Sequence, residues 1–517
     1  MNQTGYPSIA FKILFWAIVT FCVFTIPQYG LTWDEPVQHH LGKANLDYLL
    51  NKTDKLALER DDLVFYGPGF EILNQITGSF LRKSFNMQYP DAYHILPLVF
   101  FLISLWFLYK LVHKLFGNET VAFASIVALL LFPRYLAHAY FNSKDAPIAA
   151  LTIIIIYFWY SGTKGKNLKQ IMVGSALFGY SLSIRMDAVI IAAIFAVSYI
   201  LKLLIEWKDE KNNLKQIIRY FLYSLPVCLL AFFVLWPQTW KDPLIVFRSY
   251  EYFLHHGWLG EVLYLGKTYT SSAVPWHYAF FYVFLTIPLV SLIFGVIGLV
   301  RSVKMALKRV YTFEGIIIVL WLFLPLLITL KNGVLRYDGV RHYLLVLPAF
   351  AILTGLGFEY TLSLFASIKD SEKQNNLKKL FVCIVLGLML WQTIIIFPFG
   401  DSYYNEIVQK IYSKNIENSL EIEYWGATYR QGVGWLNTSA AKNSMVCVPF
   451  AEHLISAYPI RQDLIFGCSK DSDYLMFFPR LTYTPKNLDD MYKYKNLEPA
   501  YKISRLNSSL LYIYKLK

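Results

Sequence analysis

Charged residues are scarce in this chain. Only 16% of its 517 residues are Asp, Glu, Lys or Arg, whereas soluble domains carry about 25%. This scarcity excludes a disordered chain, a coiled coil and an ordinary soluble enzyme. Cysteine is scarce too, and five cysteines in a chain of this length do not make a disulfide scaffold.

Hydrophobic residues are abundant instead, at 56% of the chain, and the mean hydropathy is +0.41. This composition predicts an all-α polytopic membrane bundle. A spanning helix needs about 20 mostly apolar residues. About eleven runs approach that length, and they lie near 8–28, 92–112, 120–139, 146–161, 170–184, 187–205, 217–236, 277–300, 314–331, 342–362 and 379–397.

The net charge of +13 sets the expected orientation. Most Lys and Arg residues fall in alternate loops, such as 164–169 and 301–309. Loops of membrane proteins that are rich in Lys and Arg stay in the cytoplasm, so we expect a cytoplasmic N-terminus. We attribute the positive net charge to these cytoplasmic loops and expect no nucleic acid partner. An odd number of spans then puts the C-terminus outside. The expected location is the inner or plasma membrane.

Three outer segments are long. Two are loops, at 29–91 and 237–276, and the third is the tail, 398–517. We therefore predict a transmembrane domain over 1–397 and a small extracytoplasmic α/β domain over 398–517. Cys447 and Cys468 lie in this tail. In an oxidising compartment they pair as a disulfide; the alternative is two buried thiols.

Adjacent carboxylates, Asp34 and Glu35, follow the first apolar run and precede Pro36. Their repulsion is expected to raise the pKa of one of them, which would suit a general base or a metal ligand. The alternative is structural, because Asp34 before Pro36 is typical of a helix N-cap.

Basic residues lie at the ends of other apolar runs, on the same expected side. Each has a structural alternative: a snorkelling lysine, a salt bridge or an aromatic anchor. Together they suit a lipid-linked phosphate, because Lys and Arg bind oxyanions at an interface while the lipid tail lies between helices. The segments are Lys144-Asp145, Arg185 to Asp187, and Tyr337 to His342 with Arg341.

These segments resemble those of a known family, the membrane glycosyltransferases with the GT-C fold, in the branch of the protein mannosyltransferases (glycosyltransferase family 39) and aminoarabinose transferases. Ser143 replaces the usual proline, and Glu423 replaces an aspartate. The matching segments, in order, are Asp34-Glu35, Asn142 to Pro147, Trp236-Pro237, Pro275-Trp276-His277-Tyr278, Tyr337 to His342 and Glu423-Tyr424-Trp425-Gly426.

The resemblance implies a helical bundle whose first outer loop carries juxtamembrane helices over a cavity. It also implies transfer of a hexose or pentose from a polyprenyl-phosphate donor to a glycan, lipid or protein acceptor on the outer face. We expect inversion, with Asp34 as the base. Glu35 orients the acceptor or shares a metal, although we expect no cofactor. The remaining roles are phosphate binding by Lys144, Arg185, Arg341 and His342, and support or sugar binding by Asp145, Trp276, His277 and Tyr337.

The main alternative is a transporter or flippase of lipid-linked sugars. Transporters tend to hold charges at mid-membrane on broken helices, in two repeated halves. Here the charges lie at the ends of runs and no repeated half is visible, which favours an enzyme. A ligase using diphosphate-linked oligosaccharides and a catalytically inactive scaffold are further alternatives.

Overall fold

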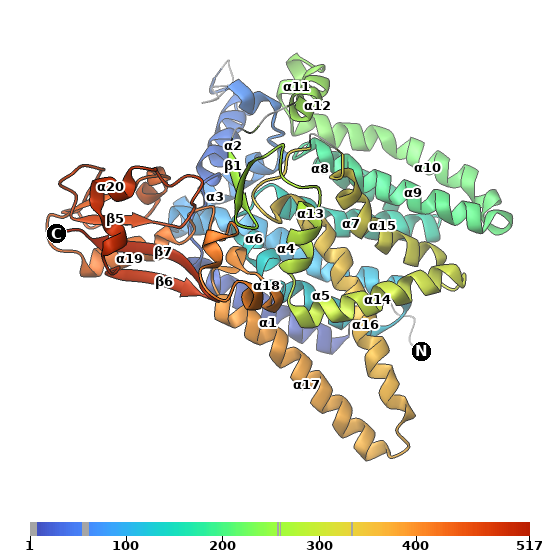
Figure 1. The fold of residues 1–517 in the computed structure, drawn as a ribbon. Coiled ribbons are helices and arrows are strands. Elements are labelled where there is room, and N and C mark those ends of the chain that lie inside the picture. Colours follow the sequence, from blue (N-terminus) through green and yellow to red (C-terminus); the bar gives the residue numbers. More distant parts are fainter. Residues whose placement is uncertain (1–7, 54–60, 256–257, 259, 332–333) are drawn as a thin grey trace.

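The computed structural model describes residues 8–53, 61–255, 258, 260–331 and 334–517 (Figure 1). Residues 54–60 of the predicted first outer loop lie outside this range. Within it, eight helical spans are long and apolar enough to cross a membrane. The helices that form these spans are α1 (Ile9–Thr25), α4 (Tyr89–Phe116), α7 (Asp145–Lys164), α9 (Val189–Ile205), α10 (Trp207–Val234), α14 (Leu289–Leu307), α16 (Leu347–Ser363) and α17 (Ser371–Ile396).

Every predicted apolar run is helical, as one helix or as two in succession, but the count of eleven spans is not confirmed. Helices α5 (Glu119–Leu130) and α6 (Pro133–Phe141) bend by 66° relative to each other, and counting them as one span gives nine in the described part of the chain. Pro133 starts α6 and cannot donate a backbone hydrogen bond, which explains the break. Two other helices are short: α8 (Leu168–Leu182) has 15 residues and α15 (Thr312–Ile328) has 17. The run at 277–300 divides into α13 (Tyr278–Leu285) and α14, with Pro288 between them.

Helix α7 lies at the centre of the bundle. Of its apolar span, 89% is buried, against 22% for α1, α10 and α17. Helix α8 packs against both α7 and α10, and α14 packs against α16. Helices α10 and α17 expose many large apolar side chains, among them Leu222, Leu230 and Trp391. Such a surface is suited to lipid, because hydrocarbon solvates apolar side chains.

The segments predicted to lie outside, 29–91, 237–276 and 398–517, gather at one end of the bundle, called here the site end (Figure 1). Two short helices of the first outer loop, α2 (Glu35–Leu49) and α3 (Gly69–Phe85), pack against each other there. Gly69 donates its backbone N–H to the carbonyl of Ser183, which joins this loop to the connection between α8 and α9. The second long loop contributes α11 (Gln238–Lys241), α12 (Ile245–His255) and the antiparallel strands β1 (Glu261–Tyr264) and β2 (Lys267–Thr270).

The tail forms the predicted small α/β domain. Its sheet has the order β4-β3-β5-β7-β6, with β3 parallel to β4 and β5 and the other pairs antiparallel. Cys447 and Cys468 are joined by a disulfide. The elements are α18 (Glu406–Ile411), α19 (Tyr429–Ser439), β3 (Met445–Cys447), β4 (Ile465–Phe466), β5 (Tyr474–Phe477), α20 (Leu488–Tyr492), β6 (Tyr501–Arg505) and β7 (Ser508–Lys515).

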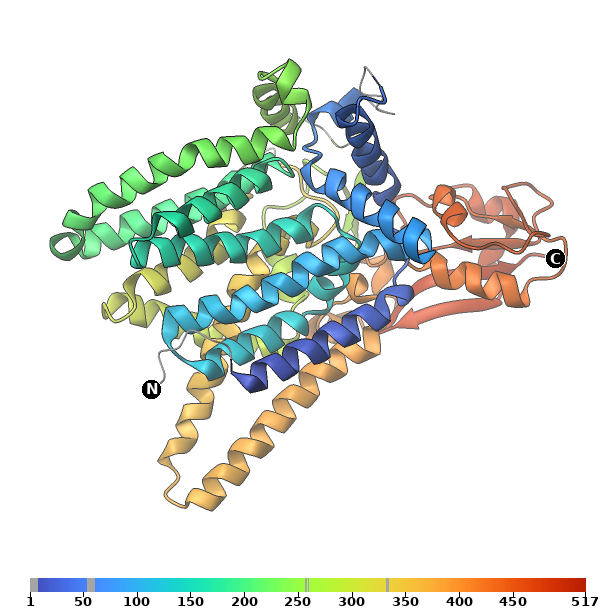
Figure 2. The same cartoon turned by 180° about the vertical axis from the view of Figure 1, so that it is seen from behind.

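This C-terminal domain docks on the site end, as the view from behind also shows (Figure 2). Arg430 of α19 pairs with Asp91 at the start of α4, with 2.5 Å between Nη1 and Oδ1. The backbone N–H of Trp33 donates to the carbonyl of Trp425 at 2.8 Å. The domain therefore contacts the segment that carries the adjacent carboxylates.

Candidate active site

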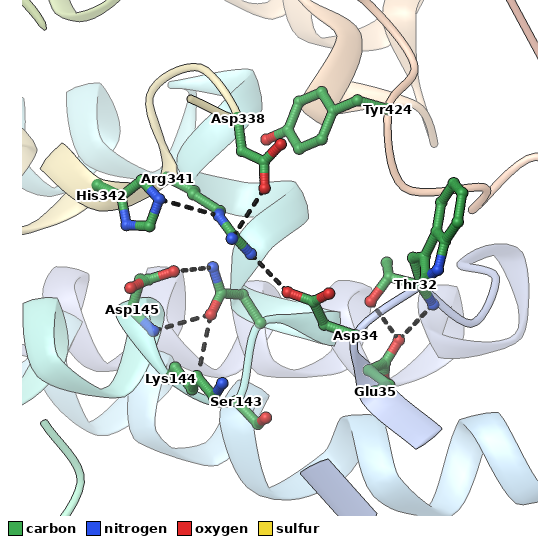
Figure 3. Close-up of polar contacts among 12 residues, drawn as sticks. Thr32, Asp34, Glu35, Ser143, Lys144, Asp145, Asp338, Arg341, His342 and Tyr424 are labelled. Atoms are coloured by element: carbon green, nitrogen blue, oxygen red, sulfur yellow. Dashed lines mark hydrogen bonds and ion pairs between the residues drawn. The ribbon is translucent and has the colours of Figure 1, made fainter. Parts of the chain in front are cut away.

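A closed turn fixes Asp34 at the start of α2. The Glu35 carboxylate accepts hydrogen bonds from the backbone N–H of Thr32 at 2.6 Å, from the Thr32 hydroxyl at 2.9 Å and from Nε2 of His94 at 2.9 Å. Asp34 occupies the N-cap position, but its side chain forms no capping hydrogen bond. Glu35 therefore holds the turn, and the Asp34 carboxylate points the other way, with 44% of its side chain exposed (Figure 3).

Arg341 joins Asp34 to Asp338. Its Nη1 donates to Oδ2 of Asp34 at 2.7 Å, and its Nη2 lies 2.8 Å from Oδ2 of Asp338. The turn before it places Asp338 and Gly339 at φ values of 52° and 62°, a left-handed conformation that suits glycine. The guanidinium also lies over the Trp425 ring, 4.9 Å from its centre. The Arg341 guanidinium therefore forms ion pairs with the carboxylates of both Asp34 and Asp338.

The pKa of Asp34 is lowered. Burial alone would raise it, but the positive charges of Arg341 and Lys144 outweigh this effect. For Asp34 the structure shows the opposite of the rise expected from its neighbour Glu35, because the two carboxylates point apart and Asp34 faces cations. The carboxylate is therefore ionised at neutral pH.

Asn142 positions Lys144. Its side-chain oxygen accepts the backbone N–H groups of Lys144 at 3.1 Å and Asp145 at 2.8 Å, and its amide donates to the Asp145 carboxylate at 3.0 Å. The neighbouring Ser143 hydroxyl donates to the buried carboxylate of Glu71. The proline expected at position 143 could not make this bond.

Lys144 is the cation available at this site. Its Nζ lies 4.4 Å from the centre of the Tyr66 ring, and it forms no ion pair with any residue that the structure describes. Burial lowers the pKa of Lys144 to about 8, although the nearby carboxylates of Asp34 and Glu71 oppose that effect. An ammonium group with a ring partner alone retains donors for an incoming anion.

Arg185 and His342 lie beside Asp34, Lys144 and Arg341, which together are called the site cluster. Arg185 donates to Asp145 at 2.5 Å and to both oxygens of Asp187 at 3.0 and 3.2 Å from Nε, so two carboxylates neutralise its charge. Asp145 thus holds Arg185 and not Lys144. His342 accepts a hydrogen bond from Nε of Arg341 at 3.4 Å, and its ring meets the Tyr337 ring at 4.7 Å.

Trp276 and His277 are placed differently. Trp276 is 61% exposed, and its ring meets that of His277. Nδ1 of His277 lies 2.7 Å from the hydroxyl of Tyr264. None of their contacts in the described part of the chain reaches Asp34 or Arg341, so the structure does not join them to the site cluster.

Two residues that adjoin the site cluster are not identified by sequence reasoning. Arg480 of the C-terminal domain places its Nη2 3.0 Å from Oδ1 of Asp338, and no local motif marks it. Asp338 lies within the motif from Tyr337 to His342, but the motif alone assigns it no role. No group of three or more His, Cys, Asp or Glu side chains suited to a metal ion occurs among the described residues.

The chain resembles known glycosyltransferases in one segment and in its fold. Residues 88–237 match the family model described as dolichyl-phosphate-mannose-protein mannosyltransferase. The structure of ArnT from Cupriavidus metallidurans bound to undecaprenyl phosphate has 12% identity and a TM-score of 0.50, with 98% of each chain covered. No curated protein matches the chain.

An archaeal enzyme has a similar fold. The apo oligosaccharyltransferase of Archaeoglobus fulgidus has 12% identity and a TM-score of 0.52 over 87% of this chain and 64% of that one. At these identities the likeness shows the fold alone. Together with the segment match, it confirms the resemblance predicted from the motifs: this chain is similar to the GT-C fold membrane glycosyltransferases.

Proposed function

We propose that the protein is a membrane glycosyltransferase that moves a monosaccharide from a polyprenyl-phosphate donor to an acceptor hydroxyl on the extracytoplasmic face, with inversion. One observation carries the proposal: an ionised, half-exposed carboxylate, Asp34, shares the site end with a lysine that has no ion-pair partner in the described part. A transfer from a phosphate ester needs both groups, one to take a proton and one to meet the departing phosphate.

The reaction follows from these two groups. Asp34 accepts the proton of the acceptor hydroxyl while the oxygen attacks the anomeric carbon. The bond from that carbon to the phosphate oxygen breaks on the opposite face, and its electron pair stays on the polyprenyl phosphate. Lys144 stabilises this charge. Inversion follows from a single displacement.

Lys144 is the preferred phosphate ligand because the two arginines among the predicted phosphate ligands already pair with carboxylates. Arg185 faces Asp145 and Asp187, and Arg341 faces Asp34 and Asp338. We therefore assign Arg341 first to holding Asp34. Phosphate binding by Arg185, Arg341 and His342, and sugar binding by Trp276 and His277, remain predictions.

The donor class rests on chemistry and likeness. A lipid-linked phosphate can place its tail between the apolar helices and its head group among the polar residues at their ends. The ArnT structure contains undecaprenyl phosphate, which supports a polyprenyl-phosphate donor here. The distribution of Lys and Arg supports an outer position for the site end. The acceptor is a glycan, a lipid or a protein.

The test uses purified full-length protein in nanodiscs with a panel of radiolabelled polyprenyl-phosphate monosaccharides and glycan, lipid and peptide acceptors. Released polyprenyl phosphate and labelled product are measured for wild type, Asp34→Asn and Asp47→Asn. Asp47 is a matched control, because it also lies on α2 but pairs with Lys52 at the surface. Transfer by wild type and Asp47→Asn, but not by Asp34→Asn, supports the proposal. In a parallel measurement with the protein reconstituted in sealed vesicles, passage of intact lipid-linked sugar across the membrane, without any transfer, would indicate the transporter instead.

A further inference from the structure

The C-terminal domain reaches the site through Arg480. We propose that Arg480 is a positioning residue, which holds Asp338 so that Arg341 keeps the Asp34 carboxylate in its working position. This inference rests on the proposed function for the role of Asp34. It makes transfer depend on a side chain of the C-terminal domain that is two ion pairs away from Arg341 and three from Asp34.

Four residues of alternating charge form a continuous line. The distances are 2.7 Å from Asp34 to Arg341, 2.8 Å from Arg341 to Asp338 and 3.0 Å from Asp338 to Arg480. Figure 3 shows the first three residues of this line. Each inner member has two partners of opposite charge, so the position of one ion pair depends on the next.

Arg480 is itself held firmly. Its side chain is 6% exposed, and its Nη1 donates to the carbonyl of Tyr424 at 2.7 Å. The guanidinium lies over the ring of Tyr483 at 4.5 Å and over that of Trp33 at 5.7 Å. A planar fork fixed on several sides can hold a carboxylate in one orientation.

Loss of Arg480 would leave the line of four residues with two carboxylates and one cation. The side chain of Asp338 is 7% exposed, and removing one partner of a buried charge leaves that charge poorly compensated. The one partner left in this line is Arg341, for which Asp338 and Asp34 then compete. Arg341 then moves towards Asp338, and its ion pair with the Asp34 carboxylate weakens.

The charge of Arg480 also acts on the titration of Asp34. Burial raises the pKa of Asp34, while the charges of Arg341, Lys144 and Arg480 lower it. Removing Arg480 therefore raises the pKa of Asp34, directly and through the weaker contact with Arg341. The charged and titratable groups around Asp34 are Arg341, His342, Tyr337 and Asp338 from the segment that leads into α16, Lys144 from the start of α7, Arg480 and Tyr483 from the C-terminal domain, and Glu35 from α2.

The experiment compares wild type with Arg480→Met, Arg480→Lys and Arg430→Met. Arg430 is the matched control, because it also docks the C-terminal domain on the bundle, through Asp91, but it is not part of the line to Asp34. The first measurement is the infrared band of the protonated Asp34 carboxyl group as a function of pH, identified by its absence in Asp34→Asn. The second measurement is transfer, normalised to folded protein.

We expect the Asp34 band to appear at higher pH in Arg480→Met than in wild type, and at the wild-type pH in Arg430→Met. Turnover of Arg480→Met should fall by roughly tenfold, with little change in the donor KM, and Arg480→Lys should recover part of it. Equal titration of Asp34 in all of these proteins would overturn the inference. If the Asp34 band shifts in Arg480→Met but wild type itself transfers no sugar, Arg480 still positions Asp34 and the proposed function is refuted.

Discussion

The pH dependence of transfer should be limited on its alkaline side by Lys144, and Lys144→Arg should remove that limit. Burial brings the pKa of Lys144 to about 8. Above this pH the ammonium group loses its proton and its charge, so stabilisation of the phosphate fades. At pH 9, about one tenth of the lysines remain protonated. An arginine keeps its charge throughout this range.

The size of the effect follows from the kind of contact that is lost. A hydrogen bond to a charged group contributes about 1.5–3 kcal/mol, so Lys144→Met should lower kcat/KM by roughly 10- to 150-fold at neutral pH. In wild type, kcat/KM should fall by about tenfold for each pH unit well above 8. The Lys144→Arg protein starts from a lower value, because the guanidinium differs in shape, but its profile should stay level.

The assay is kcat/KM for the accepted donor between pH 6 and 10, in nanodiscs of fixed lipid composition. Lys164→Arg is a matched control, because Lys164 is the last residue of the same helix, α7, far from the site end. The control should keep the wild-type alkaline decline. The reasoning is refuted if Lys144→Arg shows the same decline at the same pH as wild type.

Three further predictions concern the turn, the disulfide and metal ions. Glu35→Gln should lower the melting temperature, since a buried carboxylate with three hydrogen bonds contributes about 1–3 kcal/mol to stability. Its turnover per folded molecule should change less than that of Asp34→Asn. A normal melting temperature with lost turnover would instead assign Glu35 to the chemistry. Replacing Cys447 and Cys468 with Ser should destabilise the C-terminal domain by about 2–4 kcal/mol, measured as earlier proteolysis of that domain, and resistance equal to wild type would contradict this. Transfer should persist in EDTA, because we assign the phosphate charge to Lys144; loss of transfer that Mg²⁺ or Mn²⁺ restores would reveal a metal requirement.

The helices could be predicted well from the sequence, because a spanning segment must satisfy its backbone internally and expose apolar side chains over a fixed length. The number of membrane spans could not be predicted in this way. Pro133 breaks one predicted span into α5 and α6, and α8 has only 15 residues. Hydropathy averages over such breaks, so it locates an apolar run without giving its geometry.

The proximity of the candidate site residues could be predicted where these residues lie at the ends of apolar runs. Asp34, Lys144 and Arg341 come together because alternate connections of a helical bundle lie at the same end. Arg480 could not be found in this way. Its partner, Asp338, lies in another domain, and a long-range ion pair leaves no local pattern in either segment.

Side-chain direction was also beyond the sequence. Asp34 and Glu35 are adjacent, but the Asp34 carboxylate faces Arg341 and the Glu35 carboxylate faces Thr32 and His94. The lowered pKa of Asp34 follows from that divergence. A pattern of two adjacent acids contains no information about which of them turns inward.

The most direct test of the account is a single-turnover comparison of wild type and Asp34→Asn with the accepted polyprenyl-phosphate sugar, with donor binding measured on the same samples. We predict that Asp34→Asn binds the donor about as well as wild type but transfers the sugar roughly 10²- to 10⁴-fold more slowly, the usual contribution of a general base. Wild-type transfer by a folded Asp34→Asn protein would contradict the account.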